Sequence, residues 1–177
     1  MSLKPFLSAD SLEAANLHRI VFYKAWGVDD FTSLLANPHI FGLKDEQDGV
    51  LRGYILWQAV ENEAEILTLV VAPDSQRRGV GSRLLVALLA HLREKSIEFL
   101  FLDVASDNLP AQGFYRFHEF ELRGERPQYY LRPGNCYISA LTFFKKIRFL
   151  IGQHDRNMWK IFKQYFLDQR EFKILWE

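Results

Sequence analysis

The chain has 177 residues, of which 49% are hydrophobic and 25% are charged, and its 22 basic side chains balance 22 acidic ones. This composition predicts a globular protein of one domain and excludes a disordered chain. A net charge of zero gives no support to nucleic-acid binding, and no apolar run is long enough to span a membrane. The single cysteine, Cys136, excludes an internal disulfide. It fits a reducing compartment, and because the N-terminus shows no signal peptide we expect a cytoplasmic protein.

Apolar spacing and capping residues predict two helices at the start of the chain. The first begins at Ser8 or Asp10 and runs to about Tyr23. The second begins at Asp29 and ends before Pro38, which cannot continue a helix.

Two strands are expected next, at residues 39–43 and 51–60. The polar residues 45–49 between them predict a turn, and Gly53 inside the second strand suggests a bulge. A further turn at residues 61–64 leads into the stretch around which the chain is organised.

That central stretch combines a buried strand, a polar turn and a helix. The β-branched run 66–71 is nearly free of charge, which is typical of a strand buried on both faces. Pro73 ends it. From Val80 onwards apolar residues recur with a helical period, so a glycine-containing turn joins the strand to a helix N-terminus.

The remaining pattern predicts one more buried strand at residues 97–104, a helix capped by Asn108 and running to Phe117, and strands starting at 120–123 and spanning 137–144. Helices alternating with strands in this order predict an α/β fold with a mixed sheet and helices on both faces.

The turn before the long helix predicts an anion site. The first backbone N–H groups of a helix lack intrahelical acceptors and lie at the positive end of its dipole. Gly79 and Gly81 allow a ligand to approach this backbone, and Arg77, Arg78 and Arg83 add positive charge. A phosphate or pyrophosphate suits such a site, although a plain strand–turn–helix with solvated arginines remains an alternative.

Two common nucleotide motifs do not match this turn. A P-loop ends in Gly-Lys-Ser/Thr, whereas the residues here are Gly81, Ser82 and Arg83. A Rossmann turn carries three glycines, and only two are present.

Three segments together resemble the GNAT N-acetyltransferase superfamily. The first is Gln-Arg-Arg-Gly-Val-Gly at residues 76–81, which resembles its acetyl-CoA pyrophosphate loop. The segment 102–115, containing Asp103, Asn108 and Tyr115, and the motif Arg-Pro-Gln-Tyr-Tyr at residues 126–130 are similar to the RimI-type branch, whose members acetylate the N-terminal amine of ribosomal proteins. The resemblance covers about residues 3–144 and implies the GNAT fold.

The chain departs from that branch at two matched positions. Asp103 stands where glutamate is usual, and Glu119 stands where glycine normally ends the helix after the tyrosine. Glu119 therefore either adopts a left-handed conformation or belongs to a different turn.

The resemblance implies acetyl-CoA as cosubstrate, with no metal. The residues that it places at the coenzyme lie in the central strand, the turn and the two following helices: Leu69, Val70, Val71, Gln76, Arg77, Arg78, Gly79, Val80, Gly81, Ser82, Arg83, Asn108 and Tyr115. Tyr129 and Tyr130 are candidates for shaping the acceptor cleft, although ordinary hydrophobic packing explains them nearly as well.

Acetyl transfer to an amine needs a base and a proton donor. Tyr115 matches the residue of the family that protonates the coenzyme A sulfur. Asp103 is the base by position, and Glu65, at the start of the central strand, is its rival. Both carboxylates stay open as candidates at this point.

We therefore expect a GNAT domain over residues 1–146 and an amphipathic C-terminal extension over 147–177, with a helix near 154–167. The predicted enzyme transfers acetyl from acetyl-CoA to an amine, most simply a protein N-terminus, by direct attack. A small-molecule amine, a lysine, or a non-catalytic acetyl-CoA sensor are the alternatives, and the state is monomer or homodimer.

Overall fold

The computed structural model describes residues 2–147, which belong to one compact unit. The helix expected near residues 154–167 lies outside this part. The elements, in chain order, are β1 (Ser2–Pro5), the 3₁₀ turn η1 (Ser8–Asp10), α1 (Ser11–Val21), α2 (Val28–Leu35), β2 (Ile40–Gln47), β3 (Val50–Val60), β4 (Glu63–Val71), the 3₁₀ turn η2 (Pro73–Ser75), α3 (Val80–Glu94), β5 (Phe99–Ala105), α4 (Leu109–Phe117), β6 (Glu121–Arg132) and β7 (Cys136–Lys146).

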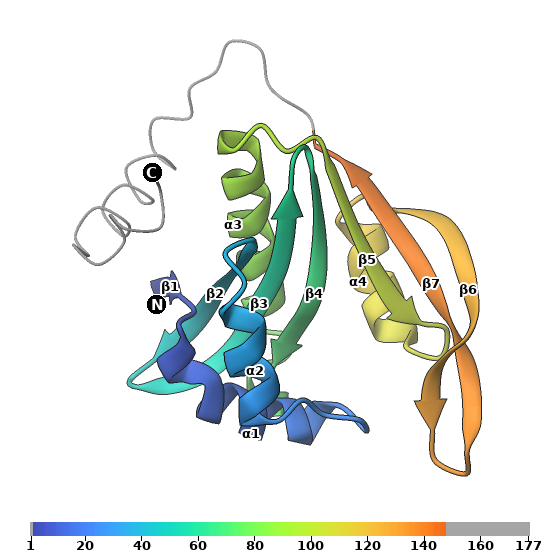
Figure 1. The fold of residues 1–177 in the computed structure, drawn as a ribbon, viewed down its shortest axis with the longest axis horizontal. Helices are drawn as coiled ribbons and strands as arrows, with labels where there is room; N and C mark the ends of the chain where they lie inside the picture. Colours follow the sequence, from blue (N-terminus) through green and yellow to red (C-terminus); the bar gives the residue numbers. More distant parts are fainter. Residues whose placement is uncertain (1, 148–177) are drawn as a thin grey trace. The chain divides into compact units, whose positions relative to one another are not determined.

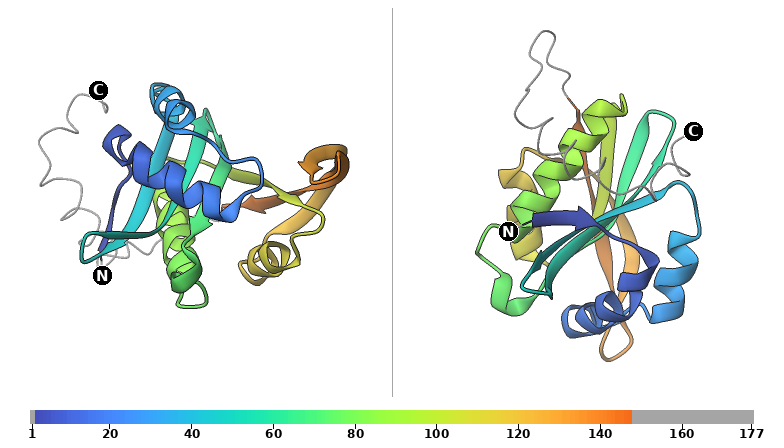
Figure 2. Two further views of the ribbon diagram at one scale, coloured as in Figure 1. Left: turned by 90° about the horizontal axis from the view of Figure 1, so that it is seen from below. Right: turned by 90° about the vertical axis from the view of Figure 1, so that its left-hand side faces the viewer.

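Residues 2–147 build a mixed sheet of seven strands in the order β1-β2-β3-β4-β5-β7-β6 (Figure 1). Only β4 and β5 pair in parallel, and β7 inserts between β5 and β6. Helices α1 and α2 cover one face of the sheet, and α3 and α4 cover the other (Figure 2). The mixed sheet with helices on both faces is therefore confirmed. None of the described helices is both long and apolar enough to cross a membrane.

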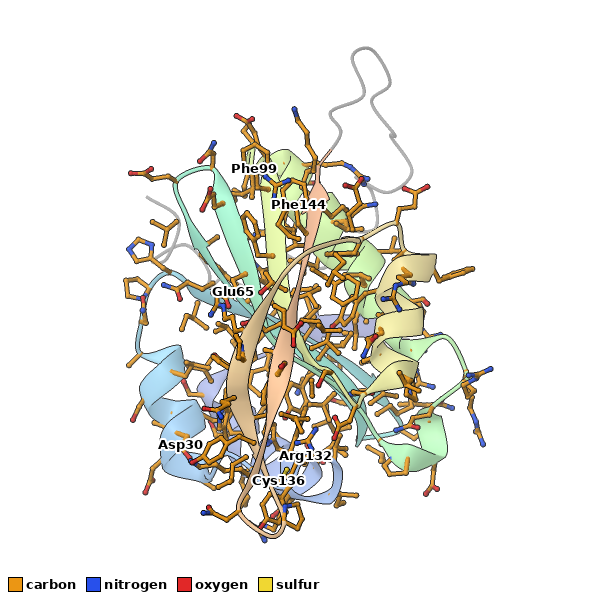
Figure 3. The ribbon with its side chains drawn as sticks, turned by 90° about the vertical axis from the view of Figure 1, so that its right-hand side faces the viewer. Asp30, Glu65, Phe99, Arg132, Cys136 and Phe144 are labelled. Atoms are coloured by element: carbon orange, nitrogen blue, oxygen red, sulfur yellow. The ribbon has the colours of Figure 1, made fainter. Side chains whose placement is uncertain are left out.

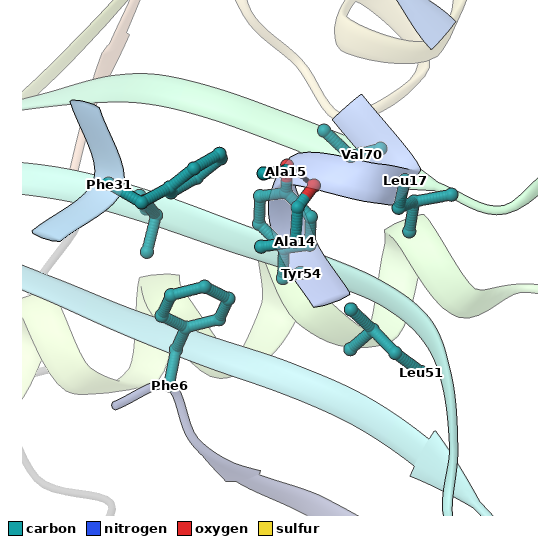
Figure 4. Packing of buried hydrophobic residues seen from close by; sticks show 9 residues of the cluster. Phe6, Ala14, Ala15, Leu17, Phe31, Leu51, Tyr54 and Val70 are labelled. Atoms are coloured by element: carbon teal, nitrogen blue, oxygen red, sulfur yellow. Dashed lines mark hydrogen bonds between the residues drawn. The ribbon is translucent and has the colours of Figure 1, made fainter. Parts of the chain in front are cut away.

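One hydrophobic cluster fixes α1 and α2 to the sheet (Figure 4). Phe31 of α2 and Tyr54 of β3 are fully buried, and their rings meet edge to face with centroids 5.9 Å apart. The Tyr54 hydroxyl donates a 3.3 Å hydrogen bond to the carbonyl of Ala14 in α1. Aromatic packing and one long-range hydrogen bond thus set the position of both helices.

The segment between α1 and α2 is organised by His18. Its imidazole stacks between Phe22 and Trp26, and its Nδ1 accepts a 3.1 Å hydrogen bond from the backbone N–H of Trp26. Burial lowers the pKa of His18 to about 4, so the ring is neutral at pH 7 and can act as this acceptor.

Several sequence-based boundaries were wrong. Strand β1 was missed, and α1 ends at Val21 rather than near Tyr23. The turn expected at residues 45–49 is confined to Asp48 and Gly49, because β2 continues to Gln47. A buried ion-pair cluster explains this extension, since Asp45 is 1% exposed and accepts hydrogen bonds from both Arg52 and Arg83.

Other expectations were confirmed or refined at single residues. The register of β2 and β3 slips beside Gly53, as a bulge requires. A Cβ on Gly53 would lie 2.6 Å from the carbonyl oxygen of Val70, so only glycine fits. Glu119 adopts the left-handed conformation, with φ of 61°. The expectation that β4 is buried on both faces was wrong. Leu69 and Val71 are only half-buried, at the end of β4 that no longer pairs with β5.

The sheet opens between its two parallel strands. β4 pairs with β5 only from Glu63 to Ile66, opposite Phe99 to Leu102, although the strands continue to Val71 and Ala105. The register of β3 and β4 shifts at the same level, between the pairs Leu56–Thr68 and Trp57–Ile66. The ends of β4 and β5 therefore separate, and the β5-facing edge of β4 beyond Ile66 has backbone groups without ladder partners.

Candidate active site

A cavity of about 430 Å³ lies where the parallel strands meet. The cavity lies on the face of the sheet that α1 and α2 cover. Leu56 and Gln58 point to the same face of β3, and Leu56 packs in the cluster under these two helices. Gln58 pairs with Glu65, so Glu65 points to this face as well. Figure 3 looks toward the β6–β7 hairpin, with Glu65 labelled beside it. The lining residues come from five neighbouring strands: Gln58, Val60, Glu63, Ala64, Glu65, Phe101, Leu102, Asp103, Arg126 and Thr142.

Asp103 is held firmly in the wall of this cavity. Its side chain is 9% exposed. The hydroxyl of Thr142, opposite it on β7, donates a 2.6 Å hydrogen bond to Oδ1, and a guanidinium nitrogen of Arg126 lies 3.3 Å from Oδ2. Both carboxylate oxygens therefore already have partners, as a nearly buried charge requires.

Glu65 has the opposite environment. Its side chain is exposed to the cavity and accepts no hydrogen bond from residues 2–147. Partial desolvation raises the pKa of Glu65 above its usual 4.5, the negative charge of Asp103 raises it further, and Arg126 opposes both effects. Of the two candidate bases, Glu65 has the free carboxylate.

The Arg-Pro-Gln-Tyr-Tyr motif forms an irregular bulge in β6, with residues 127–129 opposite Ser139 of β7. Arg126 pairs with Ala140 and Tyr130 with Ile138, so β6 uses more residues than β7 between these points. Gln128 within the bulge has a φ of 52°. The bulge carries both flanking side chains to β5, where Arg126 meets the Asp103 carboxylate and the Tyr130 hydroxyl donates a 3.3 Å hydrogen bond to the Asp103 carbonyl.

The two tyrosines of the motif differ in burial. Tyr129 is 51% exposed, and the Arg126 guanidinium lies 5.8 Å from the centre of its ring. Burial, followed by the negative charge of Asp103, raises the pKa of Tyr130 to about 12. Tyr130 therefore remains a hydrogen-bond donor near neutral pH. Tyr129 is the more exposed of the two, and neither tyrosine is among the residues that line the cavity.

Tyr115 lies on the other face of the sheet, in α4. Its buried ring packs against Phe120 and Phe143, with centroids 5.4 and 6.4 Å away. Phe143 pairs with Leu102, the neighbour of Asp103, so Tyr115 and Asp103 flank β5 from opposite sides. Burial raises the pKa of Tyr115 well above its usual 10, which keeps the phenol protonated. Its hydroxyl makes no hydrogen bond within residues 2–147.

The predicted pyrophosphate turn has the expected geometry. Gly79 is the residue before α3 and has a φ of 78°, and Arg77 also has a positive φ of 58°. The side chains of Gln76, Arg77 and Arg78 are exposed. The first N–H groups of α3, a helix of 15 residues, therefore follow directly on an accessible, basic turn.

Two residues near this turn are engaged elsewhere in the fold. The Arg83 guanidinium donates to Asp45 and to the carbonyl of Arg78. The Ser82 hydroxyl lies 3.0 Å from Nε2 of His118 at the end of α4. Both contacts tie the start of α3 to neighbouring elements.

Asn108 caps α4 as expected, because its Oδ1 accepts a 3.1 Å hydrogen bond from the N–H of Ala111. The structure thus brings Glu65 and Asp103 together at the cavity, and it places Tyr115, Asn108 and the α3 turn on elements of the opposite face.

Arg126 and Thr142 line the site but were not predicted to belong to it. Arg126 carried a signal, since it opens the Arg-Pro-Gln-Tyr-Tyr motif. Thr142 carried none, because its contact with Asp103 depends on β7 inserting beside β5.

Comparisons with known proteins agree with this architecture. The sequence model of the acetyltransferase (GNAT) family matches residues 11–120. The N-alpha-acetyltransferase RimI of Mycobacterium tuberculosis is 34% identical over 132 residues, which are 71% of this chain and 82% of that protein. A Bacillus subtilis protein, described as a candidate ribosomal protein bS18-alanine N-acetyltransferase, is 32% identical over 114 residues, 64% of this chain and 76% of that one.

Among solved structures, the ribosomal-protein-S18-alanine N-acetyltransferase from Escherichia coli superposes with a TM-score of 0.78 at 23% identity, covering 84% of this chain and 94% of that chain. It shares the fold described above. With the family match and the two relatives, this shows that the chain belongs to the GNAT acetyltransferase family and is an N-acetyltransferase.

Proposed function

We propose that the enzyme transfers the acetyl group of acetyl-CoA to the N-terminal α-amine of a protein. The observation that carries the proposal is the cavity beside the opening of β4 and β5, where a free carboxylate, Glu65, stands beside a fixed one, Asp103. The relatives support the acceptor class, since the Mycobacterium tuberculosis protein is named an N-alpha-acetyltransferase and the Escherichia coli protein acts on the alanine of ribosomal protein S18.

Acetyl-CoA would bind on the face that carries α3 and α4. The exposed turn at residues 76–79 and the first N–H groups of α3 would hold its pyrophosphate, with Arg77 and Arg78 adding positive charge. Leu69 and Val71 at the end of β4 have half-buried apolar side chains, whereas Val70 is buried in the core. Backbone groups of this segment are not paired with β5, which suits the pantetheine arm and the thioester. Arg83, engaged by Asp45, would shape this site rather than contact the phosphates.

The acceptor amine would enter the cavity on the opposite face. An α-amine has a pKa of about 7.7–8.0, so a carboxylate suffices to take its proton near neutral pH. We assign this role to Glu65, because its oxygens are free and its pKa is raised toward that of the amine. Asp103 would position the amine and strengthen Glu65 as a base.

The chemical step balances without a covalent enzyme intermediate. Glu65 takes the first proton from the ammonium group, and the neutral nitrogen attacks the thioester carbonyl carbon. The carbon–sulfur bond then breaks, and the sulfur takes a proton from the Tyr115 hydroxyl. The second proton lost by the nitrogen restores the phenol through solvent, and Glu65 releases its proton to water. Tyr115 suits this role because its phenol is protonated, buried and free of other partners within the described residues.

Steady-state acetyl transfer across peptides that vary in their first residues tests the proposal. We expect turnover to depend on a free α-amine and on the first one or two residues. Faster transfer to small amines, or to lysine in peptides with blocked N-termini, would identify one of the other acceptor classes instead.

A further inference from the structure

The contact between Arg126 and Asp103 is unusually loose for a nearly buried carboxylate. The nitrogen–oxygen distance of 3.3 Å lies beyond the usual hydrogen-bond range, and the arginine side chain is 56% exposed. A second pair made by an arginine of β6 shows the difference: Arg132 donates two hydrogen bonds of 2.7 and 2.8 Å to Asp107, which lies between β5 and α4. Arg126 therefore compensates the charge of Asp103 without being fixed by it.

The residues that line the cavity carry more negative than positive charge. Its lining carries three carboxylates, Glu63, Glu65 and Asp103, and one guanidinium, that of Arg126. Oδ1 of Asp103 accepts the hydrogen bond from Thr142, so Oδ2 is the oxygen more available to a cation. In the structure the guanidinium of Arg126 lies beside Oδ2. An ammonium group that binds this oxygen must share or replace the contact with Arg126.

Arg126 has another favourable position within reach. Its guanidinium already lies 5.8 Å from the centre of the exposed Tyr129 ring, which offers a cation–π contact outside the pair with Asp103. Leaving Asp103 therefore does not leave the arginine without a partner.

We propose that Arg126 is a specificity-determining residue that occupies, in the free enzyme, the place on Asp103 that the ammonium group of the acceptor takes on binding. This inference rests on the proposed function. Arg126 and the acceptor then compete for Oδ2, so only a group that brings its own positive charge replaces the arginine without leaving a buried carboxylate unpaired. The arrangement favours a primary ammonium and disfavours neutral nucleophiles.

The test measures acceptor affinity and turnover separately. The probe is a short peptide beginning with alanine, and its binding is followed by calorimetry with product coenzyme A present, so that no acetyl transfer occurs. We expect Arg126→Gln to tighten peptide binding and lower KM by roughly twofold to fivefold, the range that a half-exposed ion pair supplies. Because Arg126 also lowers the pKa of Glu65, its loss should move the acid limb of kcat/KM to higher pH, so the peptide-binding constant and not kcat decides the test.

Three further variants complete the design. Arg126→Met, which keeps length without charge, should behave like Arg126→Gln, and Arg126→Lys should stay closer to the wild type. Arg132→Gln is the matched control and should leave peptide affinity unchanged, because Arg132 does not line the cavity. Weaker or unchanged peptide binding in both uncharged Arg126 variants would overturn the inference while leaving the enzyme's function intact. A wild-type enzyme that acetylates no free α-amine would instead refute the proposed function.

Discussion

The hydroxyl of Thr142 on β7 donates a 2.6 Å hydrogen bond to the carboxylate of Asp103, the residue directly opposite it on β5. This bond joins β5 to β7 at the wall of the cavity and fixes the Asp103 side chain, which is 9% exposed. Thr142→Val keeps the shape and removes the donor, which should destabilise the fold by about 1–3 kcal/mol. Urea unfolding measures this change, and Thr142→Ser, which restores the hydroxyl, serves as the control. Equal stability of the valine and serine variants would contradict a stabilising role of this hydrogen bond.

The division of roles between the two carboxylates predicts distinct pH profiles. Glu65 must be unprotonated to accept the amine proton, and its raised pKa places the acid limb of kcat/KM above pH 4.5. Glu65→Gln should lower kcat/KM by about 10²-fold at neutral pH, with the loss shrinking at high pH as the amine loses its proton unaided.

Asp103→Asn should behave differently. Removing the neighbouring negative charge lowers the pKa of Glu65, so the acid limb should move to lower pH while most of the turnover survives. A loss in Asp103→Asn as large as that in Glu65→Gln, without this shift, would make Asp103 the base.

Tyr115→Phe isolates the proton donated to the leaving thiolate. The ring should keep its packing against Phe120 and Phe143, and the hydroxyl has no hydrogen bond to lose within the described residues. We expect acetyl-CoA affinity to change little and kcat to fall at least about tenfold, because the donor matters as the sulfur departs. Calorimetry and steady-state kinetics on the same preparation separate the two effects, and full activity would remove Tyr115 from the mechanism.

Gly81→Val tests the turn before α3. A Cβ at Gly81 would lie 3.5 Å from the Phe114 ring and 3.6 Å from Val71, so alanine fits, whereas the two methyl groups of valine would fill the space between α3 and α4. Acetyl-CoA affinity should fall by at least about tenfold in the valine variant and much less in Gly81→Ala. Thermal unfolding checks that both variants are folded, and unchanged affinity in a folded Gly81→Val would place the coenzyme elsewhere.

Local sequence patterns identified most elements because helices and strands leave a period in the apolar residues. The N-cap Asn108 and the end of α4 at Phe117, and the start of α3 at Val80, were predicted at the correct residues. Strand β1 has a single apolar residue before its proline, so no period was visible. The polar end of β2 was taken for a turn, because Asp45 is buried by an ion pair that sequence does not show. One of its two arginine partners, Arg83, lies 38 residues away.

The candidate site was only partly predictable for the same reason. Tyr115 and the turn at residues 76–81 belong to continuous motifs, and the structure gives both the expected local geometry. The different environments of Asp103 and Glu65 could not be predicted from sequence, since they depend on contacts that Thr142 and Arg126 make from strands far along the chain.

The most direct test of the central claim is to locate the acetyl group on a peptide that offers both amines. The enzyme, acetyl-CoA and a peptide with a free N-terminal alanine and an internal lysine are combined, and tandem mass spectrometry identifies the modified nitrogen, with Glu65→Gln as the control. We expect acetylation of the α-amine alone, strongly reduced in the Glu65→Gln variant at neutral pH. Acetylation confined to the lysine, or none on any peptide with a free α-amine, would contradict it.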